Sequence, residues 1–336
     1  MFDDASILVT GGTGSFGRAF IARLLKDYRP KKIIVYSRDE WKQYEMQTSA
    51  TFESDKDLMR YFIGDIRDKD RLMMAMSDVD YIVHAAALKQ VPALEYNPFE
   101  AVKTNIVGTQ NVIDASIACK AKKVVAISTD KAAAPINLYG ATKLTADKLV
   151  IAANNIVGEH DTRFSVVRYG NVLGSRGSVV PYFLSIKAGG DIPITDPRMT
   201  RFSITLTEGV DFVIRCFEMM HGGELFVPKI PSYRITDLAT AIAPDARQVT
   251  TGIRPGEKLH EEMITPTDAM TTLAHANHYV VFPSISSSDY TVDNFLDQRE
   301  NHKSYSKCPE EFRYASDTNP EFLSVDKLCE LVGDLS

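Results

Sequence analysis

A tyrosine and a lysine stand four residues apart in the stretch STDKAAAPINLYGATK, which spans residues 128–143. On a helix Tyr139 and Lys143 share one face, and a nearby ammonium group lowers the pKa of a phenol below its usual value of about 10. The resulting phenolate can take a proton from a hydroxyl group near neutral pH. The same spacing also occurs by chance where a tyrosine only packs a helix, so the pair predicts proton transfer only in combination with a cofactor site.

An acid and a base, Asp130 and Lys131, lie just upstream of this pair. Thr129 ends a predicted strand, where its hydroxyl could orient a substrate oxygen. Adjacent side chains on a strand point to opposite faces, so we expect Asp130 and Lys131 to act separately on one substrate. As a base Lys131 needs a depressed pKa. The alternative is an ion pair with Asp130, which would leave Lys131 protonated and idle.

Apolar runs alternate with helical segments through the first half of the chain. This alternation predicts an α/β fold with a doubly wound parallel sheet. The predicted strands span residues 6–10, 32–37, 60–65, 81–87, 123–129 and 164–170, and the predicted helices span 15–27, 40–50, 68–76, 98–119 and 139–156.

Three glycines at intervals of three residues join the first predicted strand to the first helix, in the stretch TGGTGSFG. Glycines at this place permit a tight turn and let backbone N–H groups approach a pyrophosphate. The alternative is a structural turn that binds no nucleotide. The residues predicted to contact a dinucleotide here are Gly11, Thr13, Gly14, Ser15, Phe16 and Gly17.

The end of the second strand discriminates between two dinucleotides. An acidic side chain at this place binds the ribose of NAD, whereas an arginine suits the 2′-phosphate of NADP. The sequence places Ser37 and Arg38 there, with Lys42 one turn later, and this favours NADP. Asp39 keeps the NAD alternative open, because it could turn inward and bind a ribose.

Two further strand ends supply cofactor contacts. Asp65 could accept a hydrogen bond from the adenine amino group while Ile66 packs on the ring, although Asp65 could instead cap a helix. The small side chains of residues 85–87, Ala85, Ala86 and Ala87, would let a cofactor lie against the backbone. Lys89 could reach the substrate, or it could be an ordinary solvated lysine.

The composition is that of a globular protein, with 44% hydrophobic and 24% charged residues and a net charge of −6. This charge argues against a nucleic acid or a membrane surface as partner. We find no signal peptide, no run near the roughly 20 apolar residues of a membrane span, and four scattered cysteines, and we therefore expect a cytoplasmic protein. His275 and His278 lack an acidic partner in pattern, so we predict no metal.

The alternation of strands and helices ends near residue 171. We therefore predict two domains: residues 1–170 bind the dinucleotide and carry the catalytic residues, and residues 171–336 form a smaller substrate-binding lobe over the carboxyl ends of the strands. This division allows the chain to cross back into the large domain. Residues 283–318 are polar and predicted to be irregular, and residues 323–332 are predicted to form a helix with Ser324 as its N-cap.

These motifs, with YSRDE, HAAALK, VVRYGNVLGSRGSVVPYF, ITDPRMTRF, FVPKIPS and RPGEKLHE, extend over nearly the whole length. The chain resembles an extended short-chain dehydrogenase/reductase with a Rossmann-type fold, and within that group the inverting UDP-N-acetylglucosamine 4,6-dehydratases of the PseB type. The resemblance implies a lyase that uses NADP, loses water from UDP-N-acetylglucosamine, inverts C5 and acts in pseudaminic acid biosynthesis. It also implies a homo-oligomer, a dimer or higher, formed through the helices at 98–119 and 139–156.

The resemblance assigns roles to further residues. Tyr139 takes the C4 hydroxyl proton, Lys131 the C5 proton, and Asp130 protonates the departing C6 hydroxyl. Arg201 and Arg254 would hold the diphosphate, where planar bidentate donors suit phosphate oxygens. The remaining substrate contacts it implies are Lys89, Asn171, Arg176 and Glu257, with surface salt bridging as the alternative for any single arginine.

Two other functions compete with dehydration. A UDP-sugar 4-epimerase needs the cofactor, Tyr139 and Lys143, but not Asp130 and Lys131. An NADP-sensing scaffold would need only the nucleotide fold, although such proteins usually lose the tyrosine or the lysine. Incubation in D₂O separates the first two, because only a dehydratase incorporates deuterium at C5 and releases water.

Overall fold

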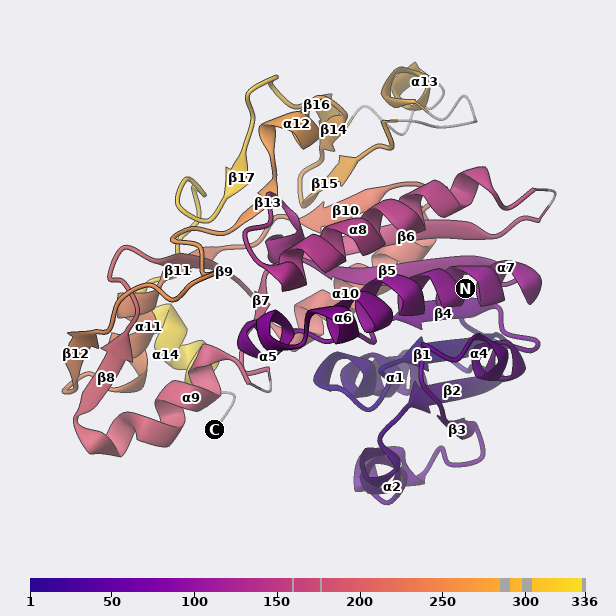
Figure 1. Cartoon of the computed structure of the whole chain (residues 1–336), viewed down its shortest axis with the longest axis horizontal. Helices are drawn as coiled ribbons and strands as arrows, with labels where there is room; N and C mark the ends of the chain where they lie inside the picture. Colours follow the sequence, from indigo (N-terminus) through magenta and orange to yellow (C-terminus); the bar gives the residue numbers. More distant parts are fainter. Residues whose placement is uncertain (159, 176, 285–290, 298–303, 334–336) are drawn as a thin grey trace.

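A ten-stranded mixed sheet is the centre of the fold in the computed structural model, which describes residues 1–158, 160–175, 177–284, 291–297 and 304–333 (Figure 1). Seven strands are parallel, in the order β3-β2-β1-β4-β5-β6-β10. Their bounds are Ser6–Thr10 for β1, Lys32–Ser37 for β2, Met59–Ile63 for β3, Tyr81–His84 for β4, Lys123–Thr129 for β5, Arg163–Tyr169 for β6 and Leu225–Pro228 for β10. Antiparallel strands β15 (His278–Val281), β14 (Thr272–Ala274) and β16 (Ser306–Lys307) extend the sheet beyond β10.

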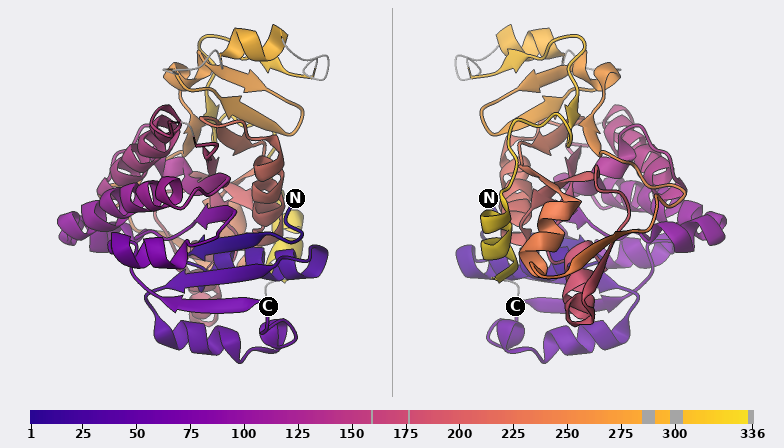
Figure 2. Two further views of the ribbon diagram at one scale, coloured as in Figure 1. Left: turned by 90° about the vertical axis from the view of Figure 1, so that its right-hand side faces the viewer. Right: turned by 90° about the vertical axis from the view of Figure 1, so that its left-hand side faces the viewer.

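Helices cover both faces of this sheet (Figure 2). One face carries α4 (Lys69–Ala75), α7 (Gly108–Ala118) and α8 (Leu138–Ala152), and the other carries α1 (Ser15–Asp27) and α10 (Leu206–Met219). Strands β1, β4 and β6 between them are mainly apolar and nearly fully buried, as expected of a covered parallel sheet, whereas the edge strand β3 is partly exposed. Shorter helices complete the large domain: α2 (Glu40–Gln47), α3 (Ala50–Glu53), α5 (Val91–Tyr96) and α6 (Pro98–Ala101).

A smaller lobe lies beside the carboxyl ends of the parallel strands (Figure 1). It has its own apolar core, built from α9 (Val179–Ile186), α11 (Ile235–Ile242), α14 (Val325–Gly333) and β8 (Asp191–Ile194). The largely exposed strand β12 (Arg247–Thr250) pairs with β8. Two small sheets connect it to the large domain, one of β7 (Asn171–Val172), β9 (Thr200–Ile204) and β11 (Ser232–Arg234), the other of β13 (Glu262–Ile264) and β17 (Tyr314–Ala315). The chain crosses back between them, since α10, β10, β14 and β15 belong to the large domain.

The sequence predictions for the first half match the structure closely. The predicted α/β fold with a doubly wound sheet is confirmed, and α1 has the predicted bounds. The helix predicted over 98–119 is instead α6, a π-helical turn at Val102–Val107, and α7. The prediction of irregular structure over 283–318 is wrong where α13 (Val292–Asp297), β16 and β17 form, because short elements in a polar segment give little periodicity. Residues 285–290 and 298–303 of this segment lie outside the described residues.

Two local predictions concern the C-terminal half. Ser324 does cap α14, since its Oγ accepts a hydrogen bond from the backbone N–H of Lys327 at 3.2 Å. The short helix α12 (Pro266–Ala269) has a capping box of Thr265 and Asp268 that the sequence analysis did not find. In the part of the chain that the structure describes, no helix combines the length and the apolar character that crossing a membrane requires.

Candidate active site

The glycine turn after β1 brings backbone, not side chains, to the end of the sheet. Gly11 adopts φ +67°, and a Cβ there would lie 3.0 Å from the backbone of Ala86. Gly14 is the N-cap of α1 and offers no side-chain hydrogen bond, so the first amides of the helix keep their donors. A Cβ at Gly17 would lie 2.5 Å from Gly12, so only glycine lets the helix pack this closely on the turn. This cradle fits a pyrophosphate group.

A buried histidine that the sequence analysis missed fixes the strands at this turn. His84, the last residue of β4, bonds Thr10 through Nδ1 at 2.8 Å and Thr109 through Nε2 at 3.0 Å. Burial, with the charge of Lys143 adding to it, lowers the pKa of His84 to about 3, so the ring is neutral. Thr10 also accepts a hydrogen bond from the amide of Ala86, which ties the alanine run to the glycine turn.

A cation lies at the end of β2, where the ribose of a bound dinucleotide is expected. Ser37 Oγ and Thr13 Oγ1 are 2.9 Å apart, which joins this strand end to the glycine turn. Asp39 does not turn inward: its carboxylate caps α2 through the amide of Lys42 at 3.0 Å and pairs with Lys42 Nζ at 2.6 Å. Arg38 is 52% exposed and reaches Asp65 only at 3.4 Å. Arg38 is therefore the more loosely paired cation at this strand end, since its 3.4 Å contact with Asp65 is longer than the 2.6 Å contact between Lys42 and Asp39.

The two residues predicted to hold the adenine are already engaged within the chain. Asp65 accepts hydrogen bonds from the backbone and side chain of Arg67, the shortest at 2.7 Å. The alternative of a helix cap fails, since Asp68 caps α4 instead. Ile66 is 4% exposed and packs against Gly108, where a Cβ would lie 2.7 Å from its Cδ1.

Tyr139 and Lys143 lie in the first turns of α8, as the spacing predicts. Asn137 caps this helix through the amide of Gly140 and also binds the carbonyl of Gly256, which belongs to the segment leading into β13. Lys143 Nζ donates to the carbonyl of Ile127 on β5 at 2.9 Å. Burial lowers the pKa of Lys143, while Asp147 acts in the opposite direction.

The phenol of Tyr139 faces the acid–base pair. Burial raises the pKa of Tyr139 to about 12, and the charge of Lys131 and a hydrogen bond with Thr129 oppose this rise. From the spacing, Lys143 is expected to supply this opposing charge. In the structure the cation that lowers the pKa of Tyr139 is Lys131, whereas Lys143 donates its hydrogen bond to the carbonyl of Ile127.

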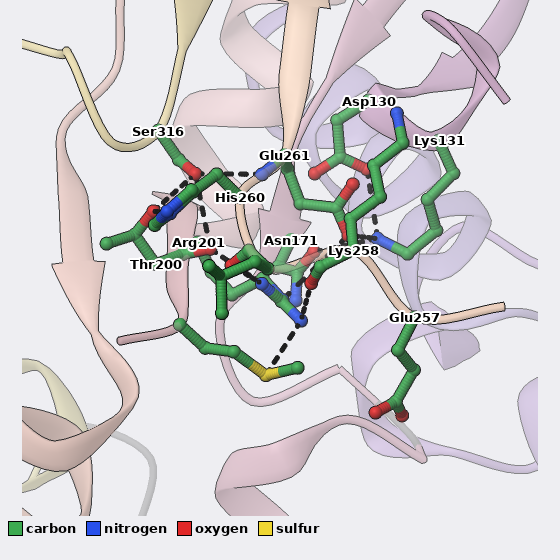
Figure 3. Close-up of polar contacts among 12 residues, drawn as sticks. Asp130, Lys131, Asn171, Thr200, Arg201, Glu257, Lys258, His260, Glu261 and Ser316 are labelled. Atoms are coloured by element: carbon green, nitrogen blue, oxygen red, sulfur yellow. Dashed lines mark hydrogen bonds and ion pairs between the residues drawn. The ribbon is translucent and has the colours of Figure 1, made fainter. Parts of the chain in front are cut away.

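Asp130 and Lys131 do not point apart, contrary to the prediction, because they lie on a 3₁₀ turn (Asp130–Ala132) and not on the strand. Lys131 Nζ donates to Asp130 Oδ1 at 3.0 Å and to Glu261 Oε1 at 3.0 Å, and it reaches Asn171 Oδ1 at 3.4 Å (Figure 3). Thr129 Oγ1 donates to the same oxygen of Asp130 at 2.9 Å. The ion pair that the sequence analysis gave as the alternative is therefore present in this structure.

A second carboxylate, Glu261, completes the cluster and was missed. It lies directly before β13, 130 positions after Lys131, and its side chain is 4% exposed. The sequence did point to this segment, since Glu261 ends the motif RPGEKLHE, but only the fold brings this loop to Asp130. Asp130 Oδ2 and Glu261 Oε2 are buried without a hydrogen-bond partner, so each carboxylate has one oxygen available to a ligand.

The charges of this cluster act on one another. Burial raises the pKa of Asp130, and the charge of Glu261 raises it further. Burial disfavours the charged form of Lys131, but Asp130 and Glu261 outweigh burial and raise the pKa of Lys131. For Glu261 the cations Lys131 and Arg201 outweigh burial and lower the pKa. In this arrangement Lys131 is an ammonium ion.

The two predicted diphosphate arginines differ in their surroundings. Arg201 on β9 is 13% exposed and donates to the carbonyls of Thr200, Lys258 and Leu259 at 2.7–3.0 Å. Arg254 is 65% exposed and lies 3.8 Å from Glu257. Glu257 points away from the cluster (Figure 3). Arg201 thus anchors the loop that carries Glu261, while Arg254 is free to meet a ligand at the surface.

The other predicted residues fall at different distances from the cluster. Asn171 on β7 touches Lys131, and the pKa of Lys89 is lowered by partial burial and by the charge of Lys131. Arg176 lies outside the described residues. Among the described residues no group of three histidine, cysteine or acidic side chains could hold a metal ion. His278 bonds the Tyr305 hydroxyl at 3.1 Å instead.

Comparisons with known proteins agree with this geometry. A family model described as polysaccharide biosynthesis protein matches residues 7–283. The UDP-N-acetylglucosamine 4,6-dehydratase (inverting) of Campylobacter jejuni is 54% identical over 99% of this chain and 98% of its own length. A UDP-glucose 4-epimerase of Rickettsia bellii is 42% identical over 83% of each chain. The X-ray structure of Pen from Bacillus thuringiensis matches with a TM-score of 0.88 and 37% identity over 100% of both chains.

Proposed function

We infer, from the fact that this chain belongs to the polysaccharide biosynthesis protein family matched over residues 7–283, that it is a nucleotide-sugar 4,6-dehydratase. Its substrate is UDP-N-acetylglucosamine, and its product is the 4-keto-6-deoxy sugar inverted at C5. The name of the Campylobacter relatives, 54% identical over almost the whole chain, supports both assignments. Use of the product in pseudaminic acid biosynthesis remains a prediction.

The observation that carries this function is that Asp130 and Lys131 lie in one cluster with Tyr139. Gly140 makes this possible, because its missing side chain lets α8 pack against the carbonyl of Lys131. An oxidation at C4 requires only Tyr139 and the cofactor. Loss of water from the same ring also requires an acid and a base beside it, and this cluster contains both.

The residues divide the proton transfers among them. Tyr139 takes the C4 hydroxyl proton, with Thr129 orienting the oxygen. A nicotinamide dinucleotide, when bound, would accept the hydride from C4 and return it to C6, and C5 then takes up a proton from solvent on the face opposite to the one that lost it. The C4 ketone acidifies the C5 proton, which Lys131 takes in its neutral form, and Asp130 in its protonated form protonates the departing C6 hydroxyl. Burial and Glu261 both favour the protonated form of Asp130 that this step needs.

We propose NADP as the dinucleotide. Ser37 and the exposed Arg38 stand at the end of β2, and Asp39 is committed to capping α2. The glycine turn of Gly11, Thr13, Gly14, Ser15, Phe16 and Gly17 would hold the pyrophosphate, with residues 85–87 beside it. Lys42 would reach the 2′-phosphate only by giving up Asp39.

The nucleotide of the substrate would lie over the smaller lobe. Arg254 is the diphosphate ligand we favour, because its guanidinium is exposed and its ion pair with Glu257 is long, at 3.8 Å. Asn171 and Lys89 border the acid–base cluster on the sugar side. Arg201 is the weaker diphosphate candidate, since the loop carbonyls take its donors. We propose assembly as a dimer or higher through α7 and α8.

One experiment tests this function against the competing one. The purified chain is incubated with UDP-N-acetylglucosamine in D₂O, and mass spectrometry and NMR report the product and its C5 configuration. The 42% identical UDP-glucose 4-epimerases favour epimerisation as the second candidate. A 6-deoxy-4-keto product with deuterium at C5 supports the dehydratase, whereas a C4 epimer without deuterium supports the epimerase. A product with C5 unchanged in configuration would contradict inversion.

A further inference from the structure

Three side-chain oxygens lie around the Lys131 amine. Of the three residues that carry them, the proposed chemistry gives a proton-transfer step only to Asp130. Asp130 and Glu261 each lie 3.0 Å from Lys131 Nζ, and Asn171 lies 3.4 Å away. Burying a carboxylate costs free energy, because a charge removed from water must be compensated by a partner. Glu261 is nearly as buried as Asp130, with side-chain exposures of 4% and 0%. Its position beside the amine therefore calls for a function of its own.

We propose that Glu261 is a positioning residue that holds the Lys131 amine beside Asp130 and keeps it protonated until substrate reaches the site. A protonated amine cannot accept the C5 proton, so the acid–base pair is inert while Lys131 stays protonated. Substrate releases the base by separating Lys131 from Glu261 or by letting Glu261 take the proton along the existing 3.0 Å contact. The inference rests on the proposed function for the task of Lys131, but the contact itself does not depend on it.

The surroundings of Lys131 agree with this role. Its charged and titratable neighbours come from several elements and from loops that pack together: Lys89, Asp130, Tyr139, Arg201, Tyr233, Lys258 and Glu261. The other cations in this set favour a neutral amine at Lys131. Asp130 and Glu261 favour the ammonium ion, and only Glu261 is free of a proposed step of its own. Glu261 is therefore the residue whose removal changes the state of Lys131 without removing the acid.

The test is Glu261→Gln, which keeps the shape of the side chain and removes its charge. The neutral fraction of Lys131 rises about tenfold for each pKa unit lost, and removing an opposite charge this close lowers a pKa by about 1–3 units. We therefore expect cyanate, which carbamoylates only neutral amines, to label Lys131 at least tenfold faster than in wild type. The rate is followed by mass spectrometry across a pH series, so that the pH dependence and not accessibility decides the result.

A second readout uses turnover. The pH profile of kcat/KM reports the acid and the base of the free enzyme. Glu261 raises the pKa of both Lys131 and Asp130. We therefore expect both limbs of the profile to move to lower pH in Glu261→Gln. Glu261→Asp, which keeps the charge, retains a profile close to wild type. Glu262→Gln is the matched control, since the cations that act on this half-buried neighbour are Arg313 and Lys258 rather than Lys131, and we expect it to change neither readout.

The outcomes separate this inference from the proposed function. If cyanate labels Lys131 faster in Glu261→Gln but the wild type has no dehydratase activity, the role of Glu261 is supported and the dehydratase function is contradicted. Unchanged labelling and unchanged limbs in Glu261→Gln would overturn the inference and leave the dehydratase standing. A variant that loses only melting temperature would mean that Glu261 merely balances the charge of Arg201, 3.8 Å away, and this also overturns it.

Discussion

The cofactor end and the acid–base cluster are built in different ways. Each contact of the glycine turn joins a strand end to the helix or strand next to it in the sheet, as Gly11 does with Ala86. The cluster instead joins residues 130 and 131 on a turn after β5 with Glu261 and Arg201 from loops and strands of the second half. One region follows from the order of strands, whereas the other exists only after the whole chain has folded.

This difference determines how each region responds to change. Parallel strands place their carboxyl ends at one edge of the sheet, so the turn after β1 is defined by the same contacts as the core. The cluster depends on a loop held by the donors of Arg201 and by the hydrogen bond from Asn137 to Gly256. We therefore expect substitutions in the cluster to affect chemistry, and substitutions at the turn to affect cofactor binding.

Lys131→Ala should give the largest effect and the cleanest test of this separation. Without the amine the C5 proton has no acceptor, so we expect dehydration to fall by about 10²–10⁴-fold, the usual value of a general base. The cofactor should stay bound, because the side chain of Lys131 pairs with Asp130, Glu261 and Asn171, which lie outside the glycine turn. Product formation is measured by NMR, and bound NADP by absorbance after denaturation. Near-normal formation of the 4-keto-6-deoxy product by this variant would refute the role of Lys131.

The sequence predicted the first region well because its information is local. The bounds of α1 and of β1, β2 and β5 follow from apolar runs, glycines and helical periodicity within a few residues. The prediction that Asp130 and Lys131 point apart was wrong, because strand geometry was extended past Thr129 into a turn. Glu261 was missed for another reason. Although Glu261 ends the motif RPGEKLHE, its neighbours in sequence do not indicate which side chain it meets, because its role depends on a contact across 130 positions.

Gly140→Ala tests the joint between α8 and the acid–base turn. A Cβ at this position would overlap the carbonyl oxygen of Lys131, so helix and turn must separate. We expect a loss of about 1–3 kcal/mol in the free energy of unfolding, as for overpacked cores, together with slower dehydration. The matched control is Gly189→Ala, where a Cβ meets no heavy atom within 4 Å. Equal melting temperatures of the two variants would contradict the close packing.

Arg254→Ala tests the substrate side of the comparison. The exposed guanidinium is proposed to meet the diphosphate, and a charge-assisted contact of this kind contributes about 1.5–3 kcal/mol. We therefore expect UDP to bind about tenfold to a hundredfold more weakly, while the NADP content stays that of wild type. Isothermal titration with UDP measures the first quantity. A variant that loses NADP but keeps its affinity for UDP would place Arg254 at the wrong end of the molecule.

Arg38→Ala should give the smallest effect, and it sharpens the cofactor side. Arg38 is the more loosely paired cation at the end of β2, whereas Lys42 is paired with Asp39 at 2.6 Å. Because the site is open to solvent, screening limits the contribution of this one charge, and we expect NADP to bind about tenfold more weakly with NAD unaffected. Lys42→Ala serves as the comparison: if the 2′-phosphate recruits Lys42 away from Asp39, both variants weaken NADP, and if it does not, only Arg38→Ala does. Equal losses for NADP and NAD in Arg38→Ala would contradict recognition of a 2′-phosphate and return Asp39 to consideration as a ribose ligand.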